Sequence, residues 1–340
     1  MARIALDAMG GDHAPQATIA GALFALSELG QAHIIQLVGR SDVIRKQLDA
    51  ELAGDFSGLA DARNRIEIIE APDVIAMTDK PAVVIRGKPK SSMMVGLTLQ
   101  TTGRSDAFVS AGSTGAQMAA STVLFKLHSG LTRPAIGTIL PTARNPVVML
   151  DAGANVDCSP DELVQFARLG TVYAEDILGR SNPTVGLLSI GEEPEKGNAA
   201  VKEAHQLLKK ADLNFAGNVE GRDVLQGENH RGPVDVVVCD GFVGNVLLKF
   251  YESVAPLMLA ILKKKAGIDW RKIEPGLRQF DPSEVGGAPL LGVKGVSVIC
   301  HGASSPRAIK NAIVVALRAV ESEMTDHIGK RLLQNSGART

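Results

Sequence analysis

Residues 6–15, LDAMGGDHAP, are the stretch around which the rest of the chain is interpreted. They follow a short apolar run, Ile4 to Leu6, and precede a helix-like pattern that begins near Gln16. A strand, a glycine turn with two acids and a histidine, and then a helix is the layout of an anion-binding loop, because the turn frees backbone N–H groups near a helix N-terminus. The turn matches neither the G-x-G-x-x-G nor the Walker pattern, so on its own it is equally well a structural turn.

The composition of the 340-residue chain indicates a large α/β protein. Hydrophobic residues make up 45%, aromatic residues make up 4%, and the 35 glycines suit many tight turns between strands and helices. A formal net charge of −1 argues against a nucleic-acid binder, which usually carries a basic surface. The three cysteines are far apart and indicate neither a disulfide framework nor a metal site, so a reduced cytoplasmic location is expected. We see no signal peptide, and no apolar run approaches the roughly 20 residues that span a bilayer.

Strand-like and helix-like segments alternate along almost the whole chain, which predicts a three-layer α/β/α fold with a largely parallel sheet. The expected strands are residues 3–6, 34–38, 66–69, 107–110, 135–140, 147–150, 184–189, 214–217, 234–239 and 296–300. The expected helices are residues 17–29, 43–52, 114–127, 161–178, 199–210 and 307–324. We expect one catalytic domain over residues 1–330, with two lobes around a cleft as an alternative, a helical hairpin near 243–275 and a tail over 331–340.

Small polar or glycine-rich turns follow most of the expected strands. Ligands bind at the carboxyl ends of the strands in open α/β sheets, so we expect these turns to line one large cleft for an anionic ligand. Besides residues 7–15, they are residues 111–116, 151–157, 190–198, 240–245 and 301–305.

Five motifs resemble those of the phosphate acyltransferase (PlsX) family, and the resemblance extends from residue 2 to about residue 325. They are DAMGGDHAP at 7–15, SAGSTGA at 110–116, DAGAN at 151–155, NVEGRD at 218–223 and CDGFVGNV at 239–246. The resemblance implies that a long-chain acyl group passes from acyl-(acyl carrier protein) to inorganic phosphate. The acyl phosphate formed would feed glycerol-3-phosphate acylation in bacterial phospholipid synthesis.

The resemblance also implies a fold similar to isocitrate and isopropylmalate dehydrogenases and phosphotransacetylase, without a nicotinamide. It implies a homodimer with peripheral membrane binding at the inner face of the membrane, and the downstream glycerol-3-phosphate acyltransferase as a further partner. Two features depart from the family pattern. Ser113 stands where many members carry Asn, and the link over residues 227–233 is longer, which leaves His230 without an implied role.

The candidate catalytic residues are His13, Lys196 and Asp12. Phosphate attack on a thioester needs a held phosphate and a stabilised oxyanion, which positioning and electrostatics can supply. His13 can donate to phosphate or protonate the leaving sulfur, although a lone histidine after a glycine turn is often structural. Lys196 suits a point-charge role on phosphate or the oxyanion, and its alternative is a solvent-facing ion pair with a neighbouring glutamate.

The candidate phosphate- and substrate-binding residues lie mostly in the strand-end turns. The alternative for residues 90–92 is a plain helix N-cap. Several of the aspartates could instead hold Mg²⁺, but capping of loops and helix starts is the simpler interpretation, and we expect no metal and no cofactor. The candidates are Asp7, Gly10, Gly11, Lys90, Ser91, Ser92, Gly112, Ser113, Thr114, Asn155, Glu220, Asp240, Asn245 and Ser304.

Residues 246–265 form an unusual apolar segment that ends in three lysines. Pro256 is expected to break a helix there or to open a second one with Ser253 as its cap. The segment is then a buried helix, a dimer contact or an exposed tip at a bilayer, and its lysines suit anionic headgroups or an acidic carrier protein. The contact candidates are Leu257, Met258, Ile261, Leu262, Lys263, Lys264 and Lys265.

Three other functions remain open at this point. A phosphotransacetylase-like enzyme would use acyl-coenzyme A as the acyl donor. A β-decarboxylating dehydrogenase would need a Mg²⁺ carboxylate cluster and a nicotinamide pocket. A membrane-bound regulator would bind acyl carriers without forming a product.

Overall fold

A β-sheet with helices on both sides forms the framework of each of the chain's two units. The computed structural model describes residues 1–30, 32–265 and 286–336. Unit 1 consists of Met1–Leu127 and Gly286–Thr325, and unit 2 consists of His128–Val285 and Asp326–Thr340. The predicted class, α/β with largely parallel strands, is confirmed.

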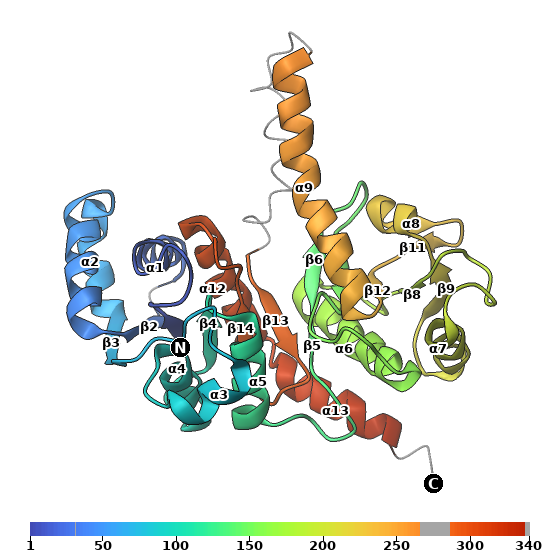
Figure 1. The fold of residues 1–340 in the computed structure, drawn as a ribbon, viewed down its shortest axis with the longest axis horizontal. Helices are drawn as coiled ribbons and strands as arrows, with labels where there is room; N and C mark the ends of the chain where they lie inside the picture. The colour runs from blue at the N-terminus through green and yellow to red at the C-terminus, as the bar shows by residue number, and fades with distance from the viewer. Residues whose placement is uncertain (31, 266–285, 337–340) are drawn as a thin grey trace. The chain divides into compact units, whose positions relative to one another are not determined.

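In unit 1 the strand order is β3-β2-β1-β4-β14-β13 (Figure 1). The first five strands run parallel to their neighbours, whereas β13 is antiparallel to β14. The turns that follow β1, β4 and β14 therefore emerge at the same edge of the sheet. The strands are β1 (Arg3–Asp7), β2 (Ile34–Gly39), β3 (Ile66–Glu70), β4 (Ala107–Ser110), β13 (Ala288–Leu291) and β14 (Ser297–Ile299).

Close helix packing in unit 1 depends on a missing side chain. A Cβ at Gly21 of α1 would lie 2.6 Å from Cβ of Ile309 on α12, so glycine allows the two helices to approach closely. The helices are α1 (Gln16–Glu28), α2 (Ser41–Ala53), the 3-10 helix η1 (Ser57–Arg65), α3 (Pro81–Gly87), α4 (Ser92–Thr101), α5 (Thr114–Phe125) and α12 (Pro306–Glu321).

In unit 2 the strand order is β6-β7-β12-β8-β9, and β6 alone in this order is antiparallel to its neighbour. The central strand β12 consists of three valines that are fully buried, as expected for a strand covered on both faces. The strands are β5 (Ala135–Ile136), β6 (Thr138–Leu140), β7 (Val147–Leu150), β8 (Val185–Leu188), β9 (Phe215–Val219), β10 (Glu228–Asn229), β11 (Gly232–Pro233) and β12 (Val236–Val238).

Helix α6 illustrates how the sequence determines helix ends in unit 2. Ser159 and Glu162 form a capping box at its start, and Gly179 ends it in the left-handed conformation, with φ of 64°. The other helices are α7 (Ala199–Lys210), α8 (Gly221–Gln226) and α9 (Gly241–Lys265), after α6 (Pro160–Leu178). Helix α13 (Met324–Ser336) begins at the end of unit 1 and continues in unit 2.

Two expectations about helices are corrected. Helix α9 runs without a break from Gly241 to Lys265 with Pro256 inside it, because Pro256 lies on an exposed stretch where water can satisfy the carbonyl that loses its partner. The second arm of the expected hairpin falls in residues 266–285, outside the described residues. Residues 331–336, expected in a tail, belong to α13, in which Ile328 and Leu332 are buried one turn apart.

Candidate functional site

The carboxylate of Asp7 connects three loops of unit 1. Asp7 ends β1 and is 2% exposed. Its Oδ2 accepts a hydrogen bond from Ser110 Oγ at 2.8 Å, and its Oδ1 accepts one from the Met9 N–H at 3.1 Å. The Ser92 hydroxyl and the Gly10 N–H also donate to this carboxylate. Burial raises the pKa of Asp7, and these hydrogen bonds act in the opposite direction.

The glycine turn after β1 lies directly against the turn after β4. A Cβ at Gly10 would be 2.6 Å from Asp7 Oδ2 and 2.9 Å from the Gly112 nitrogen. The Asp12 N–H donates to the Gly302 carbonyl at 2.8 Å, which holds the turn after β14 against the same loop. The structure therefore brings together the three turns of unit 1 that the sequence placed at strand ends.

The backbone donors of the turn after β1 differ from those expected, whereas the N–H groups expected over residues 112–115 include the start of α5. The N–H groups of Met9, Gly10 and Asp12 donate to protein acceptors, so they are not the donors that an anion would use. The start of α5 offers a better place, because the first N–H groups of a helix lack intrahelical acceptors and attract anions. There, Thr114 and Gly115 are both exposed.

Ser113 and the residues before α4 take capping roles. Ser113 Oγ accepts from the Ala116 N–H at 3.4 Å, and Ser91 Oγ accepts from the Met94 N–H at the same distance. Ser91 and Ser92 are both buried, and Ser92 donates to Asp7. For Ser91, the N-cap interpretation is therefore the one that the structure supports, while Lys90 is exposed.

His13, Asp12 and Ser304 remain accessible beside these turns. His13 and Asp12 are exposed, and Ser304 is partly exposed. The His13 carbonyl accepts the Ala17 N–H at 2.9 Å, which fixes the histidine backbone at the start of α1. His13 is thus held on an ordered turn with its side chain open to a ligand.

In unit 2, Asp151 occupies the equivalent place at the end of β7 and is fully buried. Its carboxylate accepts from the N–H groups of Ile136 at 3.1 Å, Gly153 at 3.2 Å, Ala154 at 3.0 Å and Asn155 at 2.6 Å. The Asn155 side chain adds a further donor at 2.8 Å. Burial raises the pKa of Asp151, against these hydrogen bonds.

The turn before α9 packs on the Asp151 turn. A Cβ at Gly241 would lie 2.6 Å from the Asn155 carbonyl oxygen. Asn155 is 6% exposed and also donates to the Pro134 carbonyl, so its amide holds the turn. Asp240 Oδ1 accepts from the Val243 N–H at 2.8 Å, and Asn245 is exposed.

The loop that carries Lys196 is held by buried polar groups. Asn218 Nδ2 donates to the Glu193 carbonyl at 2.8 Å, and His205 Nδ1 lies 2.9 Å from Asn218 Oδ1. The Lys196 N–H donates to the same Glu193 carbonyl at 3.0 Å. Lys196 is exposed, and over the described part of the chain it forms no ion pair with a carboxylate.

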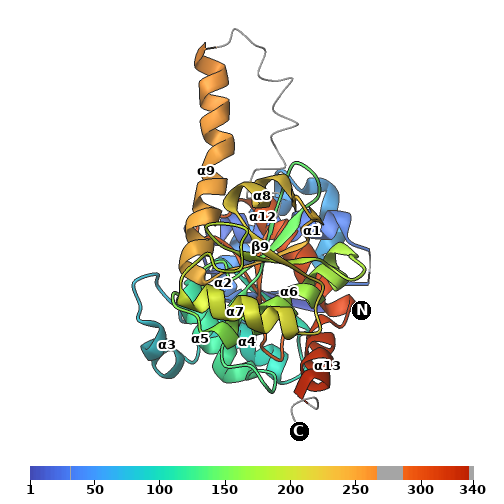
Figure 2. The ribbon, with the colours of Figure 1, turned by 90° about the vertical axis from the view of Figure 1, so that its right-hand side faces the viewer.

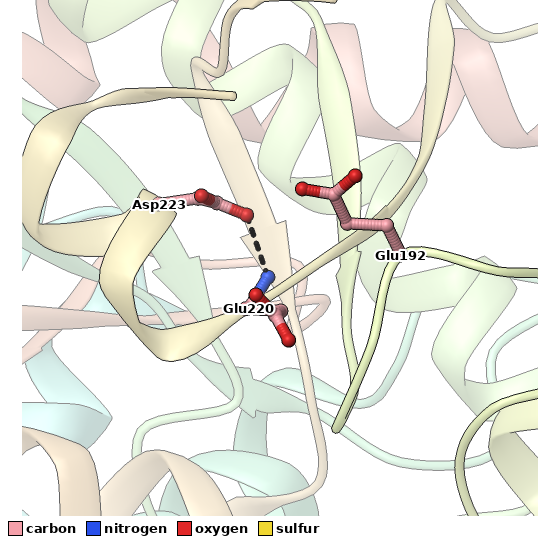
Figure 3. Close-up of side chains that lie close together, drawn as sticks. All are labelled: Glu192, Glu220 and Asp223. Carbon is pink, nitrogen blue, oxygen red and sulfur yellow. Dashed lines mark hydrogen bonds between the residues drawn. The ribbon is translucent and has the colours of Figure 1, made fainter. Parts of the chain in front are cut away.

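Three acids of unit 2 lie close together, with ligand atoms within 4.8 Å of one another: Glu192, Glu220 and Asp223 (Figure 3). Arg222 Nη2 lies 2.6 Å from Glu220 Oε2 and 3.5 Å from Glu192 Oε1, and His230 Nδ1 lies 2.9 Å from Glu192 Oε2. Asp223 accepts the Glu220 N–H at 2.8 Å as part of the α8 cap. The cluster is an ion-pair and capping network, and we assign no metal to it.

Helix α9 is the long orange helix in Figure 2. It presents apolar side chains to solvent. Leu257 is 59% exposed, and Met258 and Ile261 are exposed as well. The 22 residues Gly241–Leu262 are long and apolar enough to cross a membrane, which corrects the expectation that no such run exists. Length and composition are weak evidence for a membrane span, because core helices meet the same test. Leu262 is partly exposed and Lys264 exposed, whereas the side chains of Lys263 and Lys265 lie outside the described part.

Comparisons with known proteins agree with the resemblance. The family model described as "Fatty acid synthesis protein" matches residues 2–327. A phosphate acyltransferase from Desulforamulus reducens is 50% identical, with 99% of each chain covered. One from Heliobacterium modesticaldum is 48% identical, with 94% of each chain covered. The chain belongs to this family of phosphate acyltransferases.

Solved structures support the fold of this phosphate acyltransferase family member. A phosphotransacetylase from Streptococcus pyogenes has a TM-score of 0.60 at 18% identity, with 94% of each chain covered. A branched-chain phosphotransacylase from Enterococcus faecalis has the same TM-score at 15% identity, covering 94% of this chain and 99% of its own. At such identities the likeness shows the fold alone.

Several residues that shape these loops have no role predicted from the sequence. Ser110 bridges two loops through Asp7, and Arg222 and His230, rather than Lys196, contact the Glu192 carboxylate. A hydroxyl that follows a buried strand, as Ser110 does, was the available signal. The Arg222 and His230 pairs depend on the tertiary fold and leave no local pattern.

Proposed function

We propose that the chain transfers a long-chain fatty acyl group from acyl-(acyl carrier protein) to inorganic phosphate. The acyl phosphate would then serve phosphatidic acid synthesis by a glycerol-3-phosphate acyltransferase. The observation that carries this proposal is identity of 50% with a phosphate acyltransferase over 99% of both chains. The ordered turns after β1, β4 and β14 support it, because they combine a histidine with a helix N-terminus.

The reaction needs no enzyme nucleophile. A phosphate oxygen attacks the thioester carbonyl carbon, the C–O bond forms as the C–S bond breaks, and the thiolate leaves and takes a proton. In this proposal Thr114 and the first N–H groups of α5 hold phosphate. His13 donates to phosphate or to the leaving sulfur, and Lys196 offsets negative charge. Asp12 lies next to His13 and would orient it.

Helix α9 supports a further part of the proposal, a homodimer bound to the inner face of an anionic membrane. Exposed apolar side chains beside Lys264 suit an interface of this kind. Replacing Leu257 and Leu262 with Glu should release the protein from anionic vesicles in a flotation assay, while turnover with dissolved substrates persists. Unchanged vesicle binding would remove α9 from this role.

The decisive comparison is between acyl donors. We expect kcat/KM for acyl phosphate formation to be higher with palmitoyl-(acyl carrier protein) than with palmitoyl- or acetyl-coenzyme A. A higher value with acetyl-coenzyme A would instead support a phosphotransacetylase-like enzyme, and binding of acyl carrier protein without product would exclude both enzymes. Reactions without phosphate are the control.

A further inference from the structure

A groove of about 500 Å³ opens in unit 1 beside His13. One side is a single stripe of residues on α1, and the other sides are the end of α2 with the residues after it and the turn before α12. These helices are labelled in Figure 1. Its volume lies within the range of small-molecule sites, about 300–1,000 Å³. The lining residues are His13, Gln16, Ala17, Ala20, Phe24, Glu51, Asp55, Phe56, Ala303, Ser305 and Pro306.

The side of this groove that α1 forms is mainly apolar. Ala17 and Ala20 have small side chains, which leave room above α1. At the end away from His13, the rings of Phe24 and Phe56 meet edge to face with centroids 4.8 Å apart. Gln16 and Phe24 are eight positions apart, so the stripe extends about 12 Å along the helix. The surface therefore suits an extended aliphatic chain.

The charged residues of the groove disfavour an anionic occupant near the end of α2. Glu51 and Asp55 line it, and no lysine or arginine is among its lining residues. Glu51 is partly exposed and Asp55 is exposed, so both carboxylates reach solvent at the groove edge. The diphosphate of coenzyme A would be repelled here, whereas a neutral hydrocarbon chain would not.

We propose that this groove holds the acyl chain of the substrate. The thioester end lies at His13, and the chain follows Ala17 and Ala20 to Phe24 and Phe56. The inference rests on the proposed function, in which His13 lies at the reacting group. It adds the surface that determines the preference for acyl chain length. Ser305 and Gln16 border its polar end.

Binding of alkylphosphonates tests the groove without requiring turnover. These molecules join an alkyl chain to an anionic head that mimics acyl phosphate. We expect each added methylene to strengthen binding by about twofold to fourfold until the groove is filled, measured by calorimetry. Affinity that does not depend on chain length would overturn the proposal.

Three variants test whether the dependence of binding on alkyl chain length arises in this groove. Ala20→Leu fills the groove and Phe24→Asp places a charge at its far end, so both should weaken hexadecylphosphonate binding at least about tenfold and hexylphosphonate binding much less. Ser27→Leu adds bulk to an exposed position of α1 outside the lining and should match the wild type. Circular dichroism checks folding, and Phe24→Asp covers the case in which Ala20→Leu does not fold.

The two proposals fail in different ways. Chain-length dependence that persists in folded Ala20→Leu and Phe24→Asp would place the acyl chain elsewhere and leave the proposed reaction intact. Absence of acyl phosphate from every thioester, with the chain-length dependence intact in the wild type, would remove the proposed reaction but leave a site for an alkyl chain with an anionic head.

Discussion

Asp7 in unit 1 and Asp151 in unit 2 are both buried carboxylates, but they accept hydrogen bonds from different kinds of donors. Asp7 is the last residue of β1, and Asp151 directly follows β7. Each is buried, and burial raises the pKa of each. Asp7 binds two hydroxyls from distant segments, including Ser110, which is 103 positions away. Asp151 binds mainly the N–H groups of its own turn. Asp7 therefore connects segments that are far apart in the sequence, whereas Asp151 holds the conformation of its own turn.

The difference predicts how the two sites respond to loss of the carboxylate. A hydroxyl can rotate to another acceptor, but a buried backbone N–H cannot, and each buried group left without a partner costs about 1–3 kcal/mol. We expect Asp151→Ala to lower the free energy of unfolding by about 3–5 kcal/mol and Asp7→Ala by about 2–3 kcal/mol. Urea denaturation measures both, and the reverse order would contradict this account of the donors.

Each unit also carries an exposed residue that we expect to be needed for activity but not for stability. His13 lies in unit 1 and Lys196 in unit 2, and both are exposed on ordered loops. We expect His13→Ala and Lys196→Ala each to reduce acyl phosphate formation by about a hundredfold or more, without loss of stability. The control is Lys202→Ala, at an exposed position of α7, the helix that follows the Lys196 loop. Turnover near that of the wild type would remove the altered residue from the mechanism.

Gly10 lies beside the Asp7 carboxylate and Gly241 beside the Asp151 carboxylate, so the same substitution can be compared at both. A Cβ at Gly10 or at Gly241 would meet polar atoms at 2.6 Å, whereas one at Gly30 or Gly221 would meet nothing within 4 Å. We expect Gly10→Ala and Gly241→Ala to cost about 1–3 kcal/mol in urea denaturation. The two controls should change stability by less than about 0.5 kcal/mol. Equal changes in stability in all four Gly→Ala variants would show that the structure around the carboxylates can accommodate an added methyl group.

The pH dependence of stability is the smallest effect. An acid whose pKa is raised by folding holds its proton more tightly in the folded protein. Its contribution is therefore fully present below the ordinary aspartate pKa and is lost as the pH rises through the raised value, with a slope of at most about 1.4 kcal/mol per pH unit. Asp7→Asn and Asp151→Asn should each remove part of this decrease in the free energy of unfolding with rising pH. Wild-type stability that rises relative to the variants over this interval would contradict the direction of the pKa shifts.

The sequence predicted strands best where apolar residues are continuous and bounded by turns. β4 and β7 have the predicted ends because they are buried on both faces. β13 was missed because Pro289 and the glycines around it are typical of loops. Helix α9 was divided at Pro256 because the sequence does not show that this position faces solvent.

The sequence predicted that the turns of unit 1 lie together, but not how the atoms in these turns are arranged. The turns after β1 and β4 were placed together because parallel strands end at one edge. The orientation of the N–H groups near Gly10 could not be predicted, since it depends on Asp7 being buried against Ser92 and Ser110. Such contacts join residues about a hundred positions apart and follow only from the folded chain.

Incubation with palmitoyl-(acyl carrier protein) and phosphate labelled with heavy oxygen tests the central claim most directly. Mass spectrometry should detect palmitoyl phosphate that carries all the labelled oxygens, with release of free carrier protein, and none without the enzyme. Release of unlabelled palmitate alone, or no release of the carrier protein, would contradict acyl transfer to phosphate.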